Sequence, residues 1–276
     1  KHHVIRCLDV LLKKGASVPF FFGPNNGINK SMEKDISISN NKINKGMKID
    51  SISWNNLPNR NKKFISNKVN LDLSHRCPLE CLRCARQTYE SDGKGGLKKK
   101  PIPGRDITME EFDKITDYFA RIQFCGQYSD PIHHPHFIDM LKMIKRKGIV
   151  SQVHSASNYK SDEWFKEAFE ANPDSQWWFG IDGLPKDSHK YRVHQDGEMH
   201  FERLKMARKI LNKKPIWQYI VFNYNEQDVE TAMKMAEEID VIFNVINSGR
   251  WDNKEDDDLK PKQKKGIEVD EFEGKN

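Results

Sequence analysis

The chain has 276 residues, of which 37% are hydrophobic and 31% charged, and its formal net charge is +6. This content is enough to bury one large hydrophobic core, so we expect one main folded domain. No apolar run approaches the roughly 18 residues that a membrane span needs, and no signal-peptide pattern opens the sequence, so we expect a cytoplasmic protein without a membrane partner. The excess lysines lie in weakly patterned segments, which favours a solvated surface over a nucleic-acid partner.

Three segments of different character follow one another along the chain. Residues 1–66 lack a steady hydrophobic period and are rich in Asn, Lys and Ser, so we expect an irregular N-terminal extension. Residues 67–248 alternate short β-rich runs with amphipathic segments, which is the pattern of βα units on a parallel sheet. Residues 249–276 carry mixed charges and few apolar side chains, so we expect a charged tail or linker.

The predicted elements of the central segment come in a regular order. The first strand is expected at residues 69–74 and is followed by a long connection rich in Gly and Lys. A helix then begins at Thr108, where Glu111 completes a capping box. The remaining strands are expected at 121–126, 150–155, 176–182, 216–222 and 241–246. Six such units predict an α/β fold, namely a partial (βα)6 TIM-type barrel with an irregular N-terminal extension.

Helices between these strands are recognised by apolar residues at helical spacing. One is expected to bury Phe137, Met140, Leu141 and Ile144. The last is expected to bury Val229, Ala232, Met233 and Ala236.

Cysteines are concentrated directly after the first predicted strand. Cys77, Cys81 and Cys84 are three of the five cysteines in the chain. In parallel α/β barrels the site forms where loops leave the C-terminal ends of strands, as this loop does. Three thiolates at C-x3-C-x2-C spacing can hold a [4Fe-4S] cluster and leave one iron open for another ligand. The alternative is a structural zinc site, which normally needs a fourth protein ligand; the local candidate is His75. Cys125, after the second strand, is expected to be a small buried side chain.

The run HRCPLECLRCAR, after a first strand and within a six-unit pattern, resembles the cluster motif of the radical S-adenosylmethionine (radical SAM) enzymes. The run FGIDGLPKDSHKYR is similar to the branch with molybdopterin-type and SPASM/twitch-type peptide-modifying members. The resemblance makes residues 67–248 the core domain. It implies a [4Fe-4S] cluster, S-adenosyl-L-methionine (SAM), and an enzyme that cleaves SAM to a 5′-deoxyadenosyl radical for hydrogen abstraction. The substrate is unidentified, and the resemblance suggests a peptide. It also implies an electron donor such as flavodoxin or ferredoxin.

The resemblance also suggests which residues contact SAM. The stretch CGQYSDP stands where the family has a glycine-rich turn for the SAM amino group, and HSASN resembles the turn that contacts the ribose. Arg192 offers a guanidinium fork that matches the SAM carboxylate, and the planar guanidinium of Arg83 can stack on adenine. The contacts implied are Arg83, Gly126, Gln127, Tyr128, Ser129, Asp130, Ser155, Ser157, Asn158, Asp182 and Arg192.

Two further expectations concern how this site is used. Residues 87–105 and 182–195 are expected to line the substrate entrance, because loops at strand ends set specificity in barrel enzymes. No side chain is assigned as a general base. The altered glycine turn, with Tyr128 and Ser129 where two glycines are usual, keeps an alternative open: a non-catalytic iron–sulfur or zinc binding protein on the same scaffold.

Overall fold

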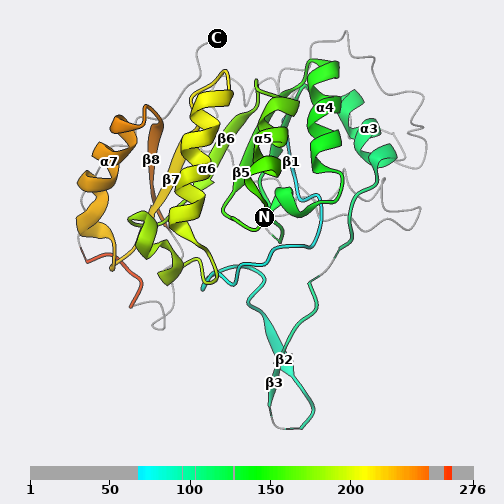
Figure 1. Ribbon diagram of the computed structural model, residues 1–276. Helices are drawn as coiled ribbons and strands as arrows, with labels where there is room; N and C mark the ends of the chain where they lie inside the picture. The colour runs from blue at the N-terminus through cyan, green and yellow to red at the C-terminus, as the bar shows by residue number, and fades with distance from the viewer. Residues whose placement is uncertain (1–67, 95, 103, 127, 249–257, 263–276) are drawn as a thin grey trace, which may run out of the picture. The chain divides into compact units, whose positions relative to one another are not determined.

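The computed structural model (Figure 1) describes residues 68–94, 96–102, 104–126, 128–248 and 258–262. The expected N-terminal extension, residues 1–66, lies outside the described residues, as does most of the expected tail. The two expected boundaries, after residues 66 and 248, therefore stay predictions. Within the described part of the chain, no helix combines the length and the apolar character needed to cross a membrane.

The core is a six-stranded parallel sheet in which each strand pairs with the next strand of the same sheet along the chain (Figure 1). The α/β class and the parallel sheet predicted from the βα alternation are thus confirmed. In the described residues the first and last of these strands do not pair with each other, so the sheet is open and forms no closed barrel. The strands are β1 (Lys68–Leu71), β4 (Arg121–Phe124), β5 (Val150–Ser155), β6 (Gln176–Gly180), β7 (Ile216–Val221) and β8 (Ile242–Asn247).

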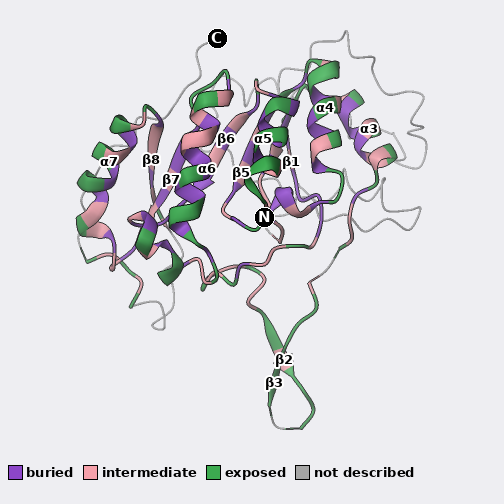
Figure 2. Ribbon diagram, in the orientation of Figure 1, coloured by how far each residue is buried: buried purple, intermediate pink, exposed green. Residues whose placement is uncertain are grey.

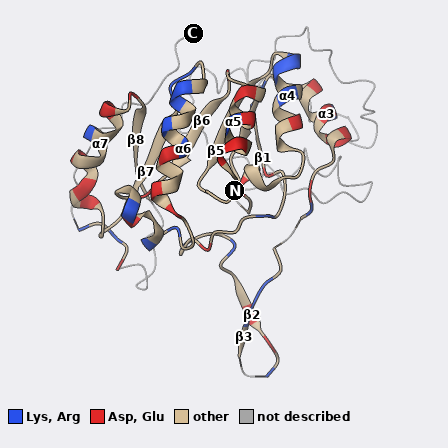
Figure 3. Ribbon diagram, viewed as in Figure 1, with Lys and Arg blue, Asp and Glu red and all other residues tan. Residues whose placement is uncertain are grey.

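Five helices of the described chain connect these strands and lie over the sheet (Figure 1): α3 (Met109–Tyr118), α4 (Phe137–Lys147), α5 (Asp162–Ala171), α6 (Gly197–Ile210) and α7 (Val229–Glu238). Right-handed crossovers between sequential strands bring successive helices to the same face. Both charge signs occur on the outward sides of α6 and α7 (Figure 3), as expected for a solvated surface. The four apolar residues predicted to be buried in α4 are buried, whereas the prediction for Met233 in α7 is wrong, since it is 41% exposed.

The two faces of the sheet differ in chemistry. Side chains alternate along each strand, so neighbouring residues point to opposite faces. Buried residues occur along both the strands and the helices (Figure 2). The buried strand positions under the helices are apolar and include Ile122, Val153, Trp177 and Trp217. The alternate positions are more polar and only partly buried: Gln123, His154, Trp178 and Gln218. Of the two adjacent tryptophans only Trp177 enters the core, and a cavity forms on the other face.

The long connection after the cysteines contains an antiparallel hairpin that sequence analysis missed. Strand β2 (Tyr89–Ser91) pairs with β3 (Leu97–Lys99), and the hairpin extends away from the sheet (Figure 1). Asp92 accepts hydrogen bonds from the main-chain nitrogens of Lys94 (2.7 Å) and Gly96 (2.9 Å) and so shapes its turn. At the base, Lys99 pairs with Glu80 in the cysteine-containing loop at 3.0 Å.

The predicted capping box at the start of α3 is confirmed and supports a stability prediction. Glu111 accepts a bond from Thr108 N (2.9 Å) and pairs with Arg105, which chiefly lowers the pKa of Glu111 to about 2. Glu111→Gln keeps an acceptor for the capping box but loses the ion pair with the partly exposed Arg105, so it should lower the free energy of unfolding by about 0.5–1 kcal/mol at pH 7. A depressed acid stabilises above its unfolded pKa, so the difference should disappear as the pH falls from about 4.5 to about 2.

Urea denaturation of both proteins across this pH range measures the effect. The matched control is Glu110→Gln in the same turn, because Glu110 is 80% exposed and pairs only with Lys114 among the ion pairs of the described chain. That change should cost under about 0.5 kcal/mol. Equal losses in the two variants would contradict the role given to Glu111.

Candidate cofactor site

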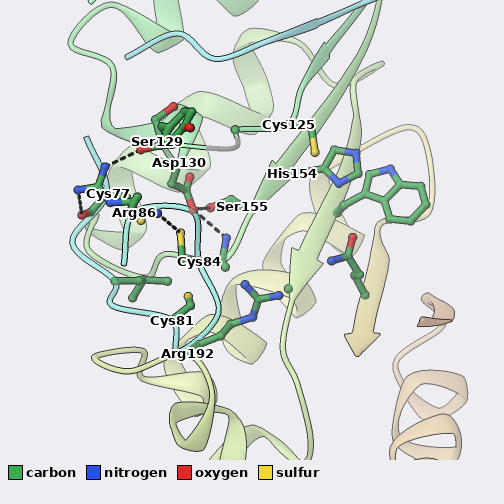
Figure 4. Close-up of a pocket in the computed structure, with 17 residues that line it drawn as sticks. Cys77, Cys81, Cys84, Arg86, Cys125, Ser129, Asp130, His154, Ser155 and Arg192 are labelled. Carbon is green, nitrogen blue, oxygen red and sulfur yellow. Dashed lines mark hydrogen bonds between the residues drawn. The ribbon is translucent and has the colours of Figure 1, made fainter. Parts of the chain in front are cut away.

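A cavity of about 180 Å³ lies at the C-terminal ends of β4, β5 and β6 (Figure 4). One wall is the cysteine loop, residues 75–87, which follows β1. A second is the glycine turn, residues 126–130, which follows β4. The third is the polar face of the sheet. The cavity therefore occupies the position at which parallel α/β proteins bind their ligands.

All three cysteines of the predicted motif line this cavity (Figure 4). The cysteine loop is fixed to the chain after β6 by two main-chain hydrogen bonds, from Glu80 N to Val193 O (3.1 Å) and from Leu82 N to Tyr191 O (3.2 Å). Within the loop, the main-chain nitrogen of Arg86 lies 3.5 Å from the sulfur of Cys84. The structure thus brings Cys77, Cys81 and Cys84 to one wall.

Burial disfavours the thiolate form of two of these cysteines. Burial raises the pKa of Cys77 to about 12 and also raises the pKa of Cys81. A buried thiolate is costly unless a cation compensates it, and a metal centre supplies such a cation. In the described chain no three Cys, His, Asp or Glu side chains converge as ligands of a single metal ion.

The glycine turn is fixed by hydrogen bonds to the side chain of Asp72. The Asp72 carboxylate accepts hydrogen bonds from Tyr128 N (3.1 Å), Ser129 N (3.1 Å) and Ser129 Oγ (2.7 Å). A Cβ atom on Gly126 would come within 1.8 Å of Ser129 O, so this tight turn requires glycine. Gly126, Tyr128 and Ser129 all line the cavity. Gln127, also predicted as a contact, lies outside the described residues.

Asp130 connects the glycine turn to the turn after β5. Its fully buried carboxylate accepts hydrogen bonds from Ser155 Oγ (3.0 Å), Ala156 N (2.8 Å) and Ser157 N (3.0 Å). Burial raises the pKa of Asp130, opposed by the neighbouring His133 and by these hydrogen bonds. Asp130 and Ser155 line the cavity, and the carboxylate fixes two of the cavity's turns relative to each other.

Four other predicted contacts do not line the cavity: Arg83, Ser157, Asn158 and Asp182. Ser157 is buried, with its hydroxyl 2.7 Å from His133 Nε2. Asn158 Oδ1 accepts a hydrogen bond from Asp196 N at 3.0 Å, which ties the turn to the start of α6. Arg83 belongs to the cysteine loop without lining the cavity. The described residues of the hairpin segment 87–105 do not line it either, whereas Arg192 of the segment 182–195 does. The substrate entrance expected at these two segments stays a prediction.

Arg192 reaches the cavity from the loop after β6 and rests on Asp182. Its Nε lies 2.8 Å from Asp182 Oδ2, while Ile220 N donates to Asp182 Oδ1 at 2.8 Å. Burial raises the pKa of Asp182, opposed by Arg192. Burial lowers the pKa of Arg192, but Asp182 and the other acidic groups around it together raise it above its usual value. A Cβ on Gly180 would lie 2.7 Å from Arg192 Nη2, so the absence of a side chain at Gly180 leaves room for the guanidinium.

Several residues of the cavity were missed by sequence reasoning. Cys125, His154, Trp178 and Gln218 form its sheet wall. The His154 ring stacks on Trp178, with centroids 4.8 Å apart and planes 15° apart, and its Nε2 lies 2.8 Å from Gln123 Nε2. Burial lowers the pKa of His154 to about 3, so its imidazole is neutral at pH 7. The available signal was a polar residue at alternate positions of otherwise apolar strands.

No family model matches the chain. The tungsten-containing aldehyde ferredoxin oxidoreductase cofactor-modifying protein of Pyrococcus furiosus is 29% identical over 120 residues, which cover 42% of this chain and 30% of that protein. The chain therefore spans less than a third of this relative.

Two solved structures of Streptococcus suis SuiB are similar in fold. SuiB bound to the precursor peptide SuiA gives a TM-score of 0.50 at 12% identity and covers 88% of this chain and 51% of SuiB. SuiB bound to S-adenosylmethionine gives a TM-score of 0.50 at 11% identity, over 71% of this chain and 44% of SuiB. At this identity the likeness concerns the α/β fold with its parallel sheet.

Proposed function

We propose that the chain is a radical SAM enzyme in which Cys77, Cys81 and Cys84 bind a [4Fe-4S] cluster and the adjoining cavity binds SAM. One observation carries the proposal. Three thiols, a turn that requires glycine, and a buried arginine line the same cavity at the strand ends. Each of these was assigned from a separate sequence motif. Their meeting at one place is what a shared cofactor site requires.

The donor set favours a multi-iron cluster over zinc. A structural zinc ion normally takes four protein ligands around one point, whereas this motif supplies three cysteines. The cysteines of a cubane each bind a different iron, so they need to line a wall rather than meet at a point. Three cysteines leave one iron for SAM.

When bound, the cluster supplies the electron that cleaves SAM to a 5′-deoxyadenosyl radical for hydrogen abstraction. In the proposal the glycine turn, fixed by Asp72, offers its main chain to the SAM amino group, and Arg192 pairs with the SAM carboxylate. Ser155 contacts the ribose. The sheet wall excludes water from the reacting atoms. The contacts assigned to Arg83, Gln127, Ser157, Asn158 and Asp182 stay predictions.

The substrate and the electron donor are assigned by class. We propose a peptide substrate, supported by the fold similarity to SuiB bound to its precursor peptide, and an electron donor such as flavodoxin or ferredoxin. The name of the P. furiosus relative supports a second candidate, the modification of an oxidoreductase cofactor. Because the thiols must stay reduced to bind iron, we propose a cytoplasmic location.

The decisive experiment is cleavage of SAM. Protein reconstituted anaerobically with iron and sulfide, and reduced with dithionite, should convert SAM to 5′-deoxyadenosine. Cys81→Ala, treated in the same way, is the control, because it lacks one proposed cluster ligand. A protein that binds about four irons but releases no more 5′-deoxyadenosine than this control would support the non-catalytic alternative instead.

A further inference from the structure

Arg86 connects the cysteine loop, to which the proposed function assigns the cluster, with the glycine turn, to which it assigns the SAM amino group. Its Nη1 donates to His75 O at 2.6 Å and to Tyr128 O at 2.5 Å, and its Nη2 lies 3.3 Å from Cys77 O. His75 and Cys77 belong to the cysteine loop, whereas Tyr128 belongs to the glycine turn. One guanidinium thus bridges segments that are more than 40 positions apart in the sequence.

The setting of Arg86 distinguishes it from the other arginines of the loop. Its side chain lines the cavity beside the cysteines (Figure 4), and in the described chain no carboxylate forms an ion pair with it. Among the described residues its side chain donates to three acceptors, and all three are main-chain carbonyls. Arg76, in contrast, lies in the same loop, is about half exposed and pairs with Asp106 at 2.7 Å. The hydrogen bonds of the Arg86 side chain therefore depend on where the main chains of the cysteine loop and the glycine turn lie, and not on the identity of another side chain.

We propose that Arg86 is a positioning residue that fixes the cysteine loop relative to the glycine turn. This inference rests on the proposed function, in which the loop holds the cluster and the turn holds the SAM amino group. The open iron and that amino group must meet within bonding distance, so the spacing of the two segments decides whether SAM is bound productively. A planar fork with five donors can satisfy several carbonyls at once, which the ammonium of a lysine cannot do with the same geometry.

The two segments share one more connection, which serves as a probe. Asp130 N donates to Arg76 O at 3.0 Å, directly between the glycine turn and the cysteine loop. Exchange of the Asp130 amide hydrogen for deuterium reports the opening of this junction. The measurement needs neither iron nor SAM, so it is made on the metal-free full chain. Amides in the middle of α4 serve as the internal reference for global unfolding.

Three variants are compared with the wild type: Arg86→Met, Arg86→Lys and the matched control Arg76→Met. The control removes the same charge from the same loop but leaves the bridge in place. In Arg86→Met the Asp130 amide should exchange about tenfold faster or more, with α4 unchanged. In reconstituted protein, Kd for SAM should rise about tenfold, and the electron paramagnetic resonance spectrum of the reduced cluster should respond less to added SAM. For Arg86→Lys, the exchange rate of the Asp130 amide and Kd for SAM should lie between those of the wild type and Arg86→Met. For Arg76→Met, both quantities should match the wild type.

The outcomes separate this proposal from the function on which it rests. If Arg86→Met exchanges at the Asp130 amide like Arg76→Met, the bridge is not what holds the two segments, and the proposal is overturned. If exchange accelerates but the affinity for SAM and the spectral response are unchanged, the coupling of loop and turn to SAM binding is refuted. If wild-type protein itself binds no iron and no SAM, the proposed function fails, and the exchange result still decides whether Arg86 fixes the loop.

Discussion

Alanine at Cys77, Cys81 or Cys84 should remove most of the bound iron and the brown colour of the reconstituted protein. Each cysteine is one of the three proposed protein ligands on one wall of the cavity, so its removal would leave the cluster with two. Iron per chain should fall from about four to well below one. Iron and sulfide analysis, with the visible absorbance spectrum, measures the loss.

Cys125→Ala is the matched control, since Cys125 lines the same cavity. It follows β4 on the sheet wall rather than in the cysteine loop. This variant should keep its cluster. A Cys81→Ala protein with full iron content, or a Cys125→Ala protein without iron, would show that the ligands are misassigned.

The number of clusters follows from the same cysteines. Apart from the three proposed ligands, the chain has only Cys7 and Cys125, and a second all-cysteine cubane requires about four thiolates. We therefore expect about four irons and four sulfides per chain, checked by Mössbauer spectroscopy. About eight irons per chain in genuine cubanes would contradict this and require ligands other than cysteine.

Asp182→Asn should lower the free energy of unfolding by about 3–5 kcal/mol, because removing one partner of a buried ion pair leaves the other charge uncompensated. Asp182 is fully buried, and the side chain of Arg192 is 12% exposed. The variant should also bind SAM more weakly, since Arg192 loses the support that directs it into the cavity. Urea denaturation and equilibrium dialysis with SAM measure the two effects.

A second substitution separates stability from binding. Arg192→Met added to Asp182→Asn removes the uncompensated charge, so it should restore part of the stability but none of the SAM affinity. The control is Asp187→Asn, which breaks the pair of Asp187 with the exposed Lys190 and should cost under about 1 kcal/mol. If Asp182→Asn is as stable as this control, the buried pair does not have the role assigned to it.

Local patterns in the sequence predicted the fold well. The capping box of Thr108 and Glu111 and the apolar spacing in α4 involve residues within one or two helical turns of each other, so their physics is visible in a short window. The hairpin was missed although the Asp92–Gly93 pair is a known hairpin signal, because the surrounding Gly and Lys were interpreted as irregular. The prediction for Met233 was wrong because apolar residues at helical spacing can lie at the exposed edge of a helix as well as on its buried face.

The candidate site was predictable only where a motif is continuous. The cysteine loop and the glycine turn each form one run of sequence, and the structure brings them together. Asp72 and Arg86 were missed because their roles depend on partners 56 and 42 positions away, respectively. His154 and Gln218 each stand within an apolar strand, and only the sheet shows that their side chains share a wall with Cys125.

The unequal faces of the sheet divide the strands into two sets of positions that can change independently. Alternate residues either pack under the helices or face the cavity, so a substitution at Gln218 changes what the cavity accepts without touching the packing of Trp217 beside it. Single substitutions at the cavity-facing strand positions can therefore change which substrate binds, while the positions packed under the helices keep the fold stable. Tolerance to mutation should alternate residue by residue along β5, β6 and β7, with a period of two.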